Sequence, residues 1–138
     1  MRTNLLLAVA GLGLLLAAGP AVAHHAFSAE FDANRPLRLQ GTVARTEWIN
    51  PHSWIHLDVE DENGQVLTWA IECGAPNALM RRGLNKNSVP VGTELIIDGF
   101  GAKDGSNTAN ARDITLPDGS TFFVGSSGTG APYDRRPR

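Results

Sequence analysis

The segment SWIHLDVEDENGQVLTWAIEC, residues 53–73, predicts a β-hairpin and with it the class of the fold. Apolar and polar side chains alternate in its first half, which is typical of a strand with one buried face. The dipeptide Asn63-Gly64 then favours a tight turn between two strands. We therefore expect antiparallel strands at 53–61 and 65–73. The side chains expected to face the core from the first strand are Ile55, Leu57 and Val59.

Further strands and one short helix are expected on both sides of this hairpin. The stretch LRLQGTVARTEWI alternates in the same way, and Gly41 within it indicates a bend or bulge. The stretch PNALMRRG predicts a short helix, with Asn77 as its cap and Gly83 at its end. The other expected strands are 37–49, 94–102, 109–116 and 121–124, and the expected helix is 78–82.

Three strands, a short helix and two further strands is the order of an oligonucleotide/oligosaccharide-binding (OB) barrel. The predicted fold class is therefore all-β with one short helix, built as a small OB-like β-barrel of five to six strands. An open β-sandwich made from the same strands is the alternative. The single cysteine, Cys73, has no partner for an internal disulfide, and we expect it to be buried and inert.

The first residues have the three parts of a cleavable secretion signal. Arg2 is followed by an apolar run at 5–18 and then by the small residues of Ala21-Val22-Ala23. The run holds about 14 residues, too few for the roughly 20 that span a bilayer. We expect export to the periplasm, cleavage after Ala23, and no membrane span in the mature chain.

The mature chain is expected to form one domain. Its expected parts are the signal peptide at 1–23, an irregular N-terminal lead-in at 24–36, the OB-like domain at 37–124 and a disordered tail at 125–138. Phe27 and Phe31 are expected to pin the lead-in to the domain surface. The net charge of −2 gives no basic face, which argues against nucleic acid as a partner.

The four histidines suggest a metal site. His24 would begin the mature chain, where its α-amino group and imidazole can chelate one metal ion. Nitrogen ligands of this kind favour Cu(II) among the divalent metals. His25 offers an alternative chelate through the intervening amide nitrogen. His52 and His56 lie on one face of a strand, roughly 13 Å apart if the strand is straight, so one of them is expected to join His24.

Two other residues lie on the histidine face and are secondary candidates for a ligand-binding surface. Trp54 is placed to stack on a sugar or another flat ligand, or to shield a metal. Asp58 is a secondary candidate for the metal itself. The opposing interpretation is that the N-terminal histidines are unliganded polar residues and that His56 lies on a solvated strand face. The polar segment 103–112 is interpreted as a hairpin connection or, alternatively, a ligand loop.

Four motifs together resemble a known family. They are HHAFSAEFD at 24–32, EWINPHSWIH at 47–56, PNALMRRG at 76–83 and GAKDGSNTANAR at 101–112. The mature chain resembles, over about its whole length, a family of small exported bacterial proteins known only as a domain of unknown function. The resemblance implies that the histidine pair at 24–25 belongs to the domain pattern. More loosely, the strand order is similar to periplasmic OB-fold proteins with binding or stress roles.

Three functions remain open from the sequence. The first is an exported periplasmic protein that binds copper through the mature N-terminal histidine and the strand histidines. The second is an OB-like module that binds a small ligand or another periplasmic protein without metal. The third is a copper-dependent redox enzyme, although no nucleophile, acid or base stands in a catalytic frame, so an enzyme is not predicted.

Overall fold

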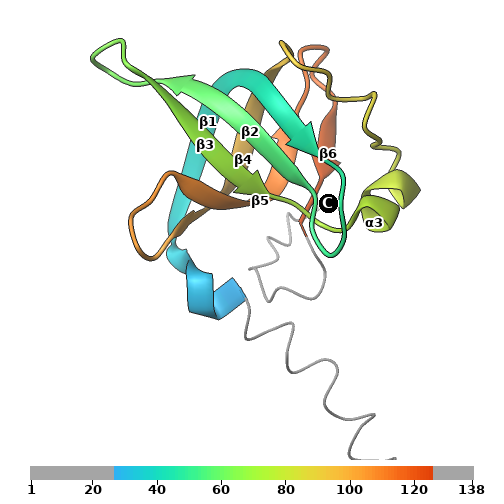
Figure 1. The fold of residues 1–138 in the computed structure, drawn as a ribbon, viewed down its shortest axis with the longest axis horizontal. Helices are drawn as coiled ribbons and strands as arrows, with labels where there is room; N and C mark the ends of the chain where they lie inside the picture. Colours follow the sequence, from blue (N-terminus) through green and yellow to red (C-terminus); the bar gives the residue numbers. More distant parts are fainter. Residues whose placement is uncertain (1–26, 126–138) are drawn as a thin grey trace, which may run out of the picture.

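The computed structural model describes residues 27–125, which form one twisted β-sheet with short helical segments (Figure 1). Its order is β3-β2-β1-β4-β5-β6, with antiparallel pairing between these neighbours. The strands are β1 (Phe31–Glu47), β2 (Trp54–Glu60), β3 (Val66–Glu72), β4 (Glu94–Ala102), β5 (Thr108–Thr115) and β6 (Thr121–Phe123). The helix α3 (Pro76–Arg81) lies between β3 and β4. The all-β class with a short helix is confirmed.

One additional pairing closes this sheet into a ring. β3 runs parallel to β5 over three residue pairs, with Ala70, Ile71 and Glu72 opposite Thr108, Ala109 and Asn110. Five strands thereby follow one another around the ring in the order β1-β2-β3-β5-β4, and β6 extends β5 on the outside. This closure and the helix after β3 agree with the expected OB-like arrangement. We call the β3–β5 pairing the seam.

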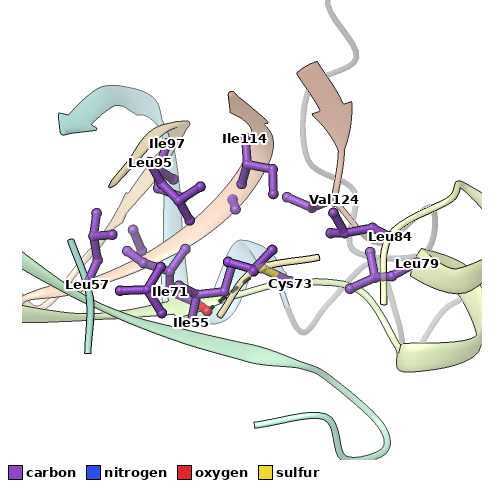
Figure 2. Packing of buried hydrophobic residues seen from close by; sticks show 14 residues of the cluster. Ile55, Leu57, Ile71, Cys73, Leu79, Leu84, Leu95, Ile97, Ile114 and Val124 are labelled. Carbon is purple, nitrogen blue, oxygen red and sulfur yellow. Dashed lines mark hydrogen bonds between the residues drawn. The ribbon is translucent and has the colours of Figure 1, made fainter. Parts of the chain in front are cut away.

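The core fills the inside of the ring (Figure 2). Alternation along β2 sends Ile55 and Leu57 inward, as the sequence predicted, whereas Val59 is only partly buried against the cluster. Ile71 enters the core from β3. The short helix and the loop after it add Leu79 and Leu84, each 1% exposed. The remaining fully enclosed side chains of this cluster are Val43, Cys73, Val89, Leu95, Ile97, Ala109, Ala111, Ile114 and Val124.

The chain before the first predicted strand is more regular than expected. Residues 27–30 are helical, and β1 begins at Phe31 rather than at 37. Phe31 pairs with Ala102 across an irregularity that ends at Pro36. The polar sequence between them shows no alternation, which is why the sequence did not indicate a strand. The expected anchoring is confirmed, because Phe27 and Phe31 are buried with Phe100 in a second cluster.

The helix α3 starts earlier than predicted. Its N-cap is Ala75, and no side chain caps it, so the assignment of Asn77 as the cap was wrong. Pro76 takes the first helical position, where its missing N–H costs nothing and its fixed φ suits a helix. Gly83 follows the helix with φ at 88°, as predicted for a helix end.

Gly41 lies where β1 bends between two neighbours. A Cβ atom at this position would lie 2.2 Å from the carbonyl oxygen of Asp58 on β2. The predicted bend is therefore a close backbone approach, and the bulge itself lies between Val43 and Arg45. At Thr42, the next residue, β1 pairs with both β2 and β4, which is the condition for a ring.

Candidate functional site

The candidate site lies on the outer face of the ring, around the start of β2 and the end of β3. Trp54 and Glu72 are directly opposite in the β2–β3 pairing, so their side chains share a face. The pairing continues one step further, because the N–H of Ser53 donates to Gly74 and the N–H of Cys73 donates to Ser53. His52 therefore enters the outer face beside Glu72.

His52 is held by a buried carboxylate. Its Nδ1 atom lies 3.0 Å from Oε1 of Glu72, whose side chain is 8% exposed, whereas the His52 side chain is 28% exposed. The same Oε1 atom accepts a hydrogen bond of 3.3 Å from Nδ2 of Asn110. Within residues 27–125, the other ring nitrogen of His52, Nε2, has no hydrogen-bond partner. A carboxylate that accepts from Nδ1–H leaves the lone pair on Nε2, the form that binds metals.

The burial of Glu72 changes its acidity. Removal of its carboxylate from water raises the pKa of Glu72 above the ordinary 4.5. The neighbouring His52 lowers the pKa, the charge of Glu30 raises it, and the hydrogen bond from Asn110 lowers it. The raised value means that the folded protein holds a proton on Glu72 at pH values where the unfolded chain has released it.

This raised pKa predicts a pH-dependent gain from Glu72→Gln. The contribution of Glu72 protonation to stability is complete below pH 4.5 and is lost as the pH rises through the folded-state pKa. We expect the free energy of unfolding of Glu72→Gln, relative to the wild type, to increase between about pH 4 and about pH 8. Urea unfolding at both pH values measures this difference.

Exposed Glu62 in the β2–β3 turn provides the matched control. Glu62→Gln removes an exposed carboxylate, whereas Glu72→Gln removes a buried one. A relative stability of Glu72→Gln that stays constant or falls with pH would show that the pKa of Glu72 is not raised.

His56 takes a different partner from His52. Its Nε2 atom lies 2.8 Å from Oε1 of Glu47 on β1 and 2.9 Å from Nη2 of Arg45. Arg45 also binds Glu47 directly, at 2.8 Å. One ring nitrogen cannot donate to Glu47 and accept from Arg45 together, so the consistent arrangement has Nε2–H donating to the carboxylate that both partners share. The Nε2 atom of His56 is therefore engaged by Glu47 on β1.

The structure describes the remaining candidates only in part. Trp54 is half-buried on the outer face, and Asp58 accepts a hydrogen bond of 2.6 Å from the Thr68 hydroxyl. His24 and His25 lie outside the described residues, as do the predicted signal peptide and nearly all of the predicted tail. Within 27–125, no three His, Cys, Asp or Glu side chains come close enough together to hold a metal ion. Over the same residues, no helix has the length and apolar character needed to cross a bilayer.

Sequence reasoning missed Glu72, which is the buried polar partner of His52, and Asn110, which binds Glu72. Alternation along TWAIEC does place Glu72 on the outer face together with Thr68 and Ala70. Its burial there was not predictable, because it depends on the seam with β5. Cys73, by contrast, is buried as expected, and burial raises the pKa of its thiol to about 12, which makes it a poor nucleophile.

A surface pocket of about 310 Å³ lies close to the site, between the helical turn at 27–30 and the β4–β5 loop. Its lining includes Glu30, Lys103, Ser106 and Thr108. The loop is joined to the helical turn by a hydrogen bond from the N–H of Lys103 to the carbonyl of Glu30. The polar segment considered as a ligand loop therefore does border a pocket.

Comparison with known proteins gives a family but no activity. A family model described as "Family of unknown function (DUF6152)" matches residues 11–111, more than half of the chain. The match includes His52, Glu72 and Asn110, and it confirms the resemblance drawn from the four motifs. No curated protein and no solved structure matches the chain.

Proposed function

We propose that this chain, which belongs to the DUF6152 family, is an exported periplasmic protein that binds Cu(II) through His24 and His52. The observation that carries the proposal is the orientation of His52. Buried Glu72 holds Nδ1 and leaves Nε2 unpartnered among residues 27–125, on a ring that is partly exposed. A histidine fixed by a carboxylate in this way is the usual arrangement of a histidine metal ligand.

The anchoring of Phe27 supports a role for the mature N-terminus. Phe27 packs against Phe100, with the ring centroids 5.7 Å apart. Phe100 is opposite Asn110 in the β4–β5 pairing, and Asn110 is opposite Glu72 at the seam. With strands about 4.8 Å apart, Phe100 and Glu72 are separated by about 10 Å.

Covalent geometry then limits how far the amino end can be from His52. His24 lies three residues before Phe27, and three residues extend over at most about 10 Å. If residues 24–26 extend from Phe27 toward the seam, the α-amino group and imidazole of His24 reach the outer face at Glu72. With Nε2 of His52 they supply three nitrogen ligands, a set that Cu(II) prefers. The amine, with a reference pKa near 8, releases its proton to solvent on binding.

The test is a Cu(II) titration of the mature protein, purified from the periplasm with His24 as its native first residue, followed by electron paramagnetic resonance. We expect one stoichiometric site with nitrogen hyperfine structure. His24→Ala is expected to lose this site and to bind Cu(II) only as weakly as an unstructured peptide. His52→Ala is expected to weaken Cu(II) binding by at least about tenfold, which is the loss typical when even a residue that only orients a metal ligand is replaced.

Two matched controls make the test specific. His56→Ala removes an imidazole from the same strand but one that is engaged by Glu47, so copper affinity should not change. Acetylation of the mature amino end keeps every side chain and removes the amine as a ligand, and it should abolish the site. Equal affinity of the wild type, the acetylated chain and His24→Ala would refute the proposal.

A second candidate function follows from the pocket beside the β4–β5 loop. Its lining combines an ammonium group, two carboxylates and two hydroxyl groups, contributed by Lys103, Glu30, Asp104, Ser106 and Thr108. Ala29, Phe31 and Ala102 add apolar surface to the same lining, so the pocket suits a small ligand that has both polar and apolar parts. A protein that binds copper no better than a peptide, yet shows ligand-induced NMR shifts confined to this pocket, would favour this function over the first.

A further inference from the structure

Asn110 is a polar residue in an unusual place. It is 1% exposed, although its neighbours Ala109 and Ala111 take the inward positions in the core. Alternation puts its side chain on the outer face of β5, where it is covered. A buried amide is costly unless its polar atoms are paired. Only one of them is paired within residues 27–125, since Oδ1 has no partner there.

The paired atom explains the orientation of the amide. Nδ2 donates to Oε1 of Glu72 at 3.3 Å. If the amide were reversed, Oδ1 would face that carboxylate oxygen, and two acceptors would lie in contact. The acceptor Glu72 therefore fixes the amide, and the amide in turn fixes Glu72.

The same oxygen of Glu72 also accepts from His52. Oε1 thus lies between two donors, Nδ1 of His52 and Nδ2 of Asn110, which approach it from the segment before β2 and from β5. Glu72 and Asn110 are directly paired at the seam. The ring of His52 is consequently oriented from across the seam and not only by its own strand.

We propose that Asn110 is a positioning residue for the metal-binding nitrogen of His52, an inference that rests on the proposed function. Asn110 holds Oε1 of Glu72, Oε1 holds Nδ1–H of His52, and Nε2 is left with its lone pair directed outward. Without the amide, the carboxylate has one polar contact fewer and the preference for the Nδ1–H tautomer weakens. Among residues 27–125, Asn110 is hydrogen-bonded to Glu72 and not to His52, so it acts on the ligand through Glu72.

The first test needs no metal. NMR of the imidazole nitrogens in the metal-free protein, at a mildly alkaline pH where histidine is neutral, reports which nitrogen carries the proton. We expect wild-type His52 to be the Nδ1–H tautomer. Asn110→Leu fills a similar volume and removes the unpaired Oδ1. In this variant we expect His52 to shift toward the mixture of Nδ1–H and Nε2–H tautomers that a solvent-exposed histidine has. The tautomer of His56 should not change, since its partner is Glu47.

Two further variants complete the design. Asn107→Ala removes an exposed amide from the loop just before β5 and is expected to leave His52 unchanged. Asn110→Ala replaces Asn110→Leu if leucine prevents folding, as judged by circular dichroism. A folded Asn110 variant whose His52 keeps the wild-type tautomer would overturn the inference.

The second test measures Cu(II) affinity. We expect Asn110→Leu to weaken Cu(II) binding by about tenfold or more, as is common when a residue that orients a metal ligand is replaced. In a His52→Ala background the same substitution should have no effect, because its action passes through His52. If the Asn110 variant changes the His52 tautomer but the wild-type protein binds no copper, the positioning role stands and the copper proposal is refuted. An equal loss of affinity with and without His52 would overturn the positioning role.

Discussion

Gly99→Ala is expected to lower the free energy of unfolding by about 3 kcal/mol, as for strongly overpacked sites. A Cβ atom on Gly99 would lie 2.3 Å from the carbonyl oxygen of Asn110 and 3.1 Å from Cα of Ala111. Both contacts are with the backbone of β5, which cannot rotate away as a side chain would. The strands must separate at the irregularity between Asp98 and Gly99 to admit the methyl group.

Urea unfolding followed by tryptophan fluorescence measures this loss, and Gly101→Ala is its control. Gly101 is buried on the same strand, but a Cβ there would meet only the ends of the Leu37 and Arg35 side chains, at 3.4 Å and 3.8 Å, and no backbone atom. We expect a change below about 1 kcal/mol at Gly101, within the range of strand propensities. Equal losses at both glycines would mean that the contact with Asn110 is not what excludes a side chain at Gly99.

Leu57→Ala is expected to cost about 3–5 kcal/mol. Leu57 is 0% exposed and belongs to the core cluster inside the ring (Figure 2). Its removal leaves a cavity bordered by strands that are paired on both sides, so the walls cannot collapse into it. A domain of this size has a total stability of about 5–15 kcal/mol, and the variant should therefore be close to unfolding.

Val66→Ala is the control for Leu57→Ala. Val66 is 59% exposed on β3, and its truncation should change the stability by no more than about 0.5 kcal/mol. If Leu57→Ala is too unstable to purify, Leu57→Val can be measured in its place. Its loss of unfolding free energy should lie between those of Leu57→Ala and Val66→Ala. Similar unfolding midpoints for Leu57→Ala and Val66→Ala would contradict the assignment of Leu57 to the core.

The strands that the sequence predicted well are those whose pattern is local. Alternation and turn residues define β2, β3 and β5 to within one residue at each end, and β4 agrees at both ends. The hairpin turn is also as predicted, with Gly64 at a φ of 78°. The start of β1 was missed because its pairing with β4 is long-range and its sequence there is polar.

The candidate site was only half predictable for the same physical reason. The alternation of β2 placed His52 and His56 on one face and kept them apart, and the structure gives them separate carboxylate partners, Glu72 and Glu47. Glu72 and Asn110, however, are 38 residues apart in the chain. No local pattern predicts a parallel pairing over that separation, so the burial of Glu72 and its contact with Asn110 become visible only in the folded ring.

The seam also has a consequence for the order of folding. The β2–β3 and β4–β5 hairpins join neighbouring segments, and such low-contact-order structure forms early. The three-residue seam joins these hairpins and must wait until both exist. A partly folded chain can thus contain His52 on a complete hairpin and still lack the Asn110 contact. The orientation of His52 is then a marker of finished folding, which separates native molecules from late intermediates.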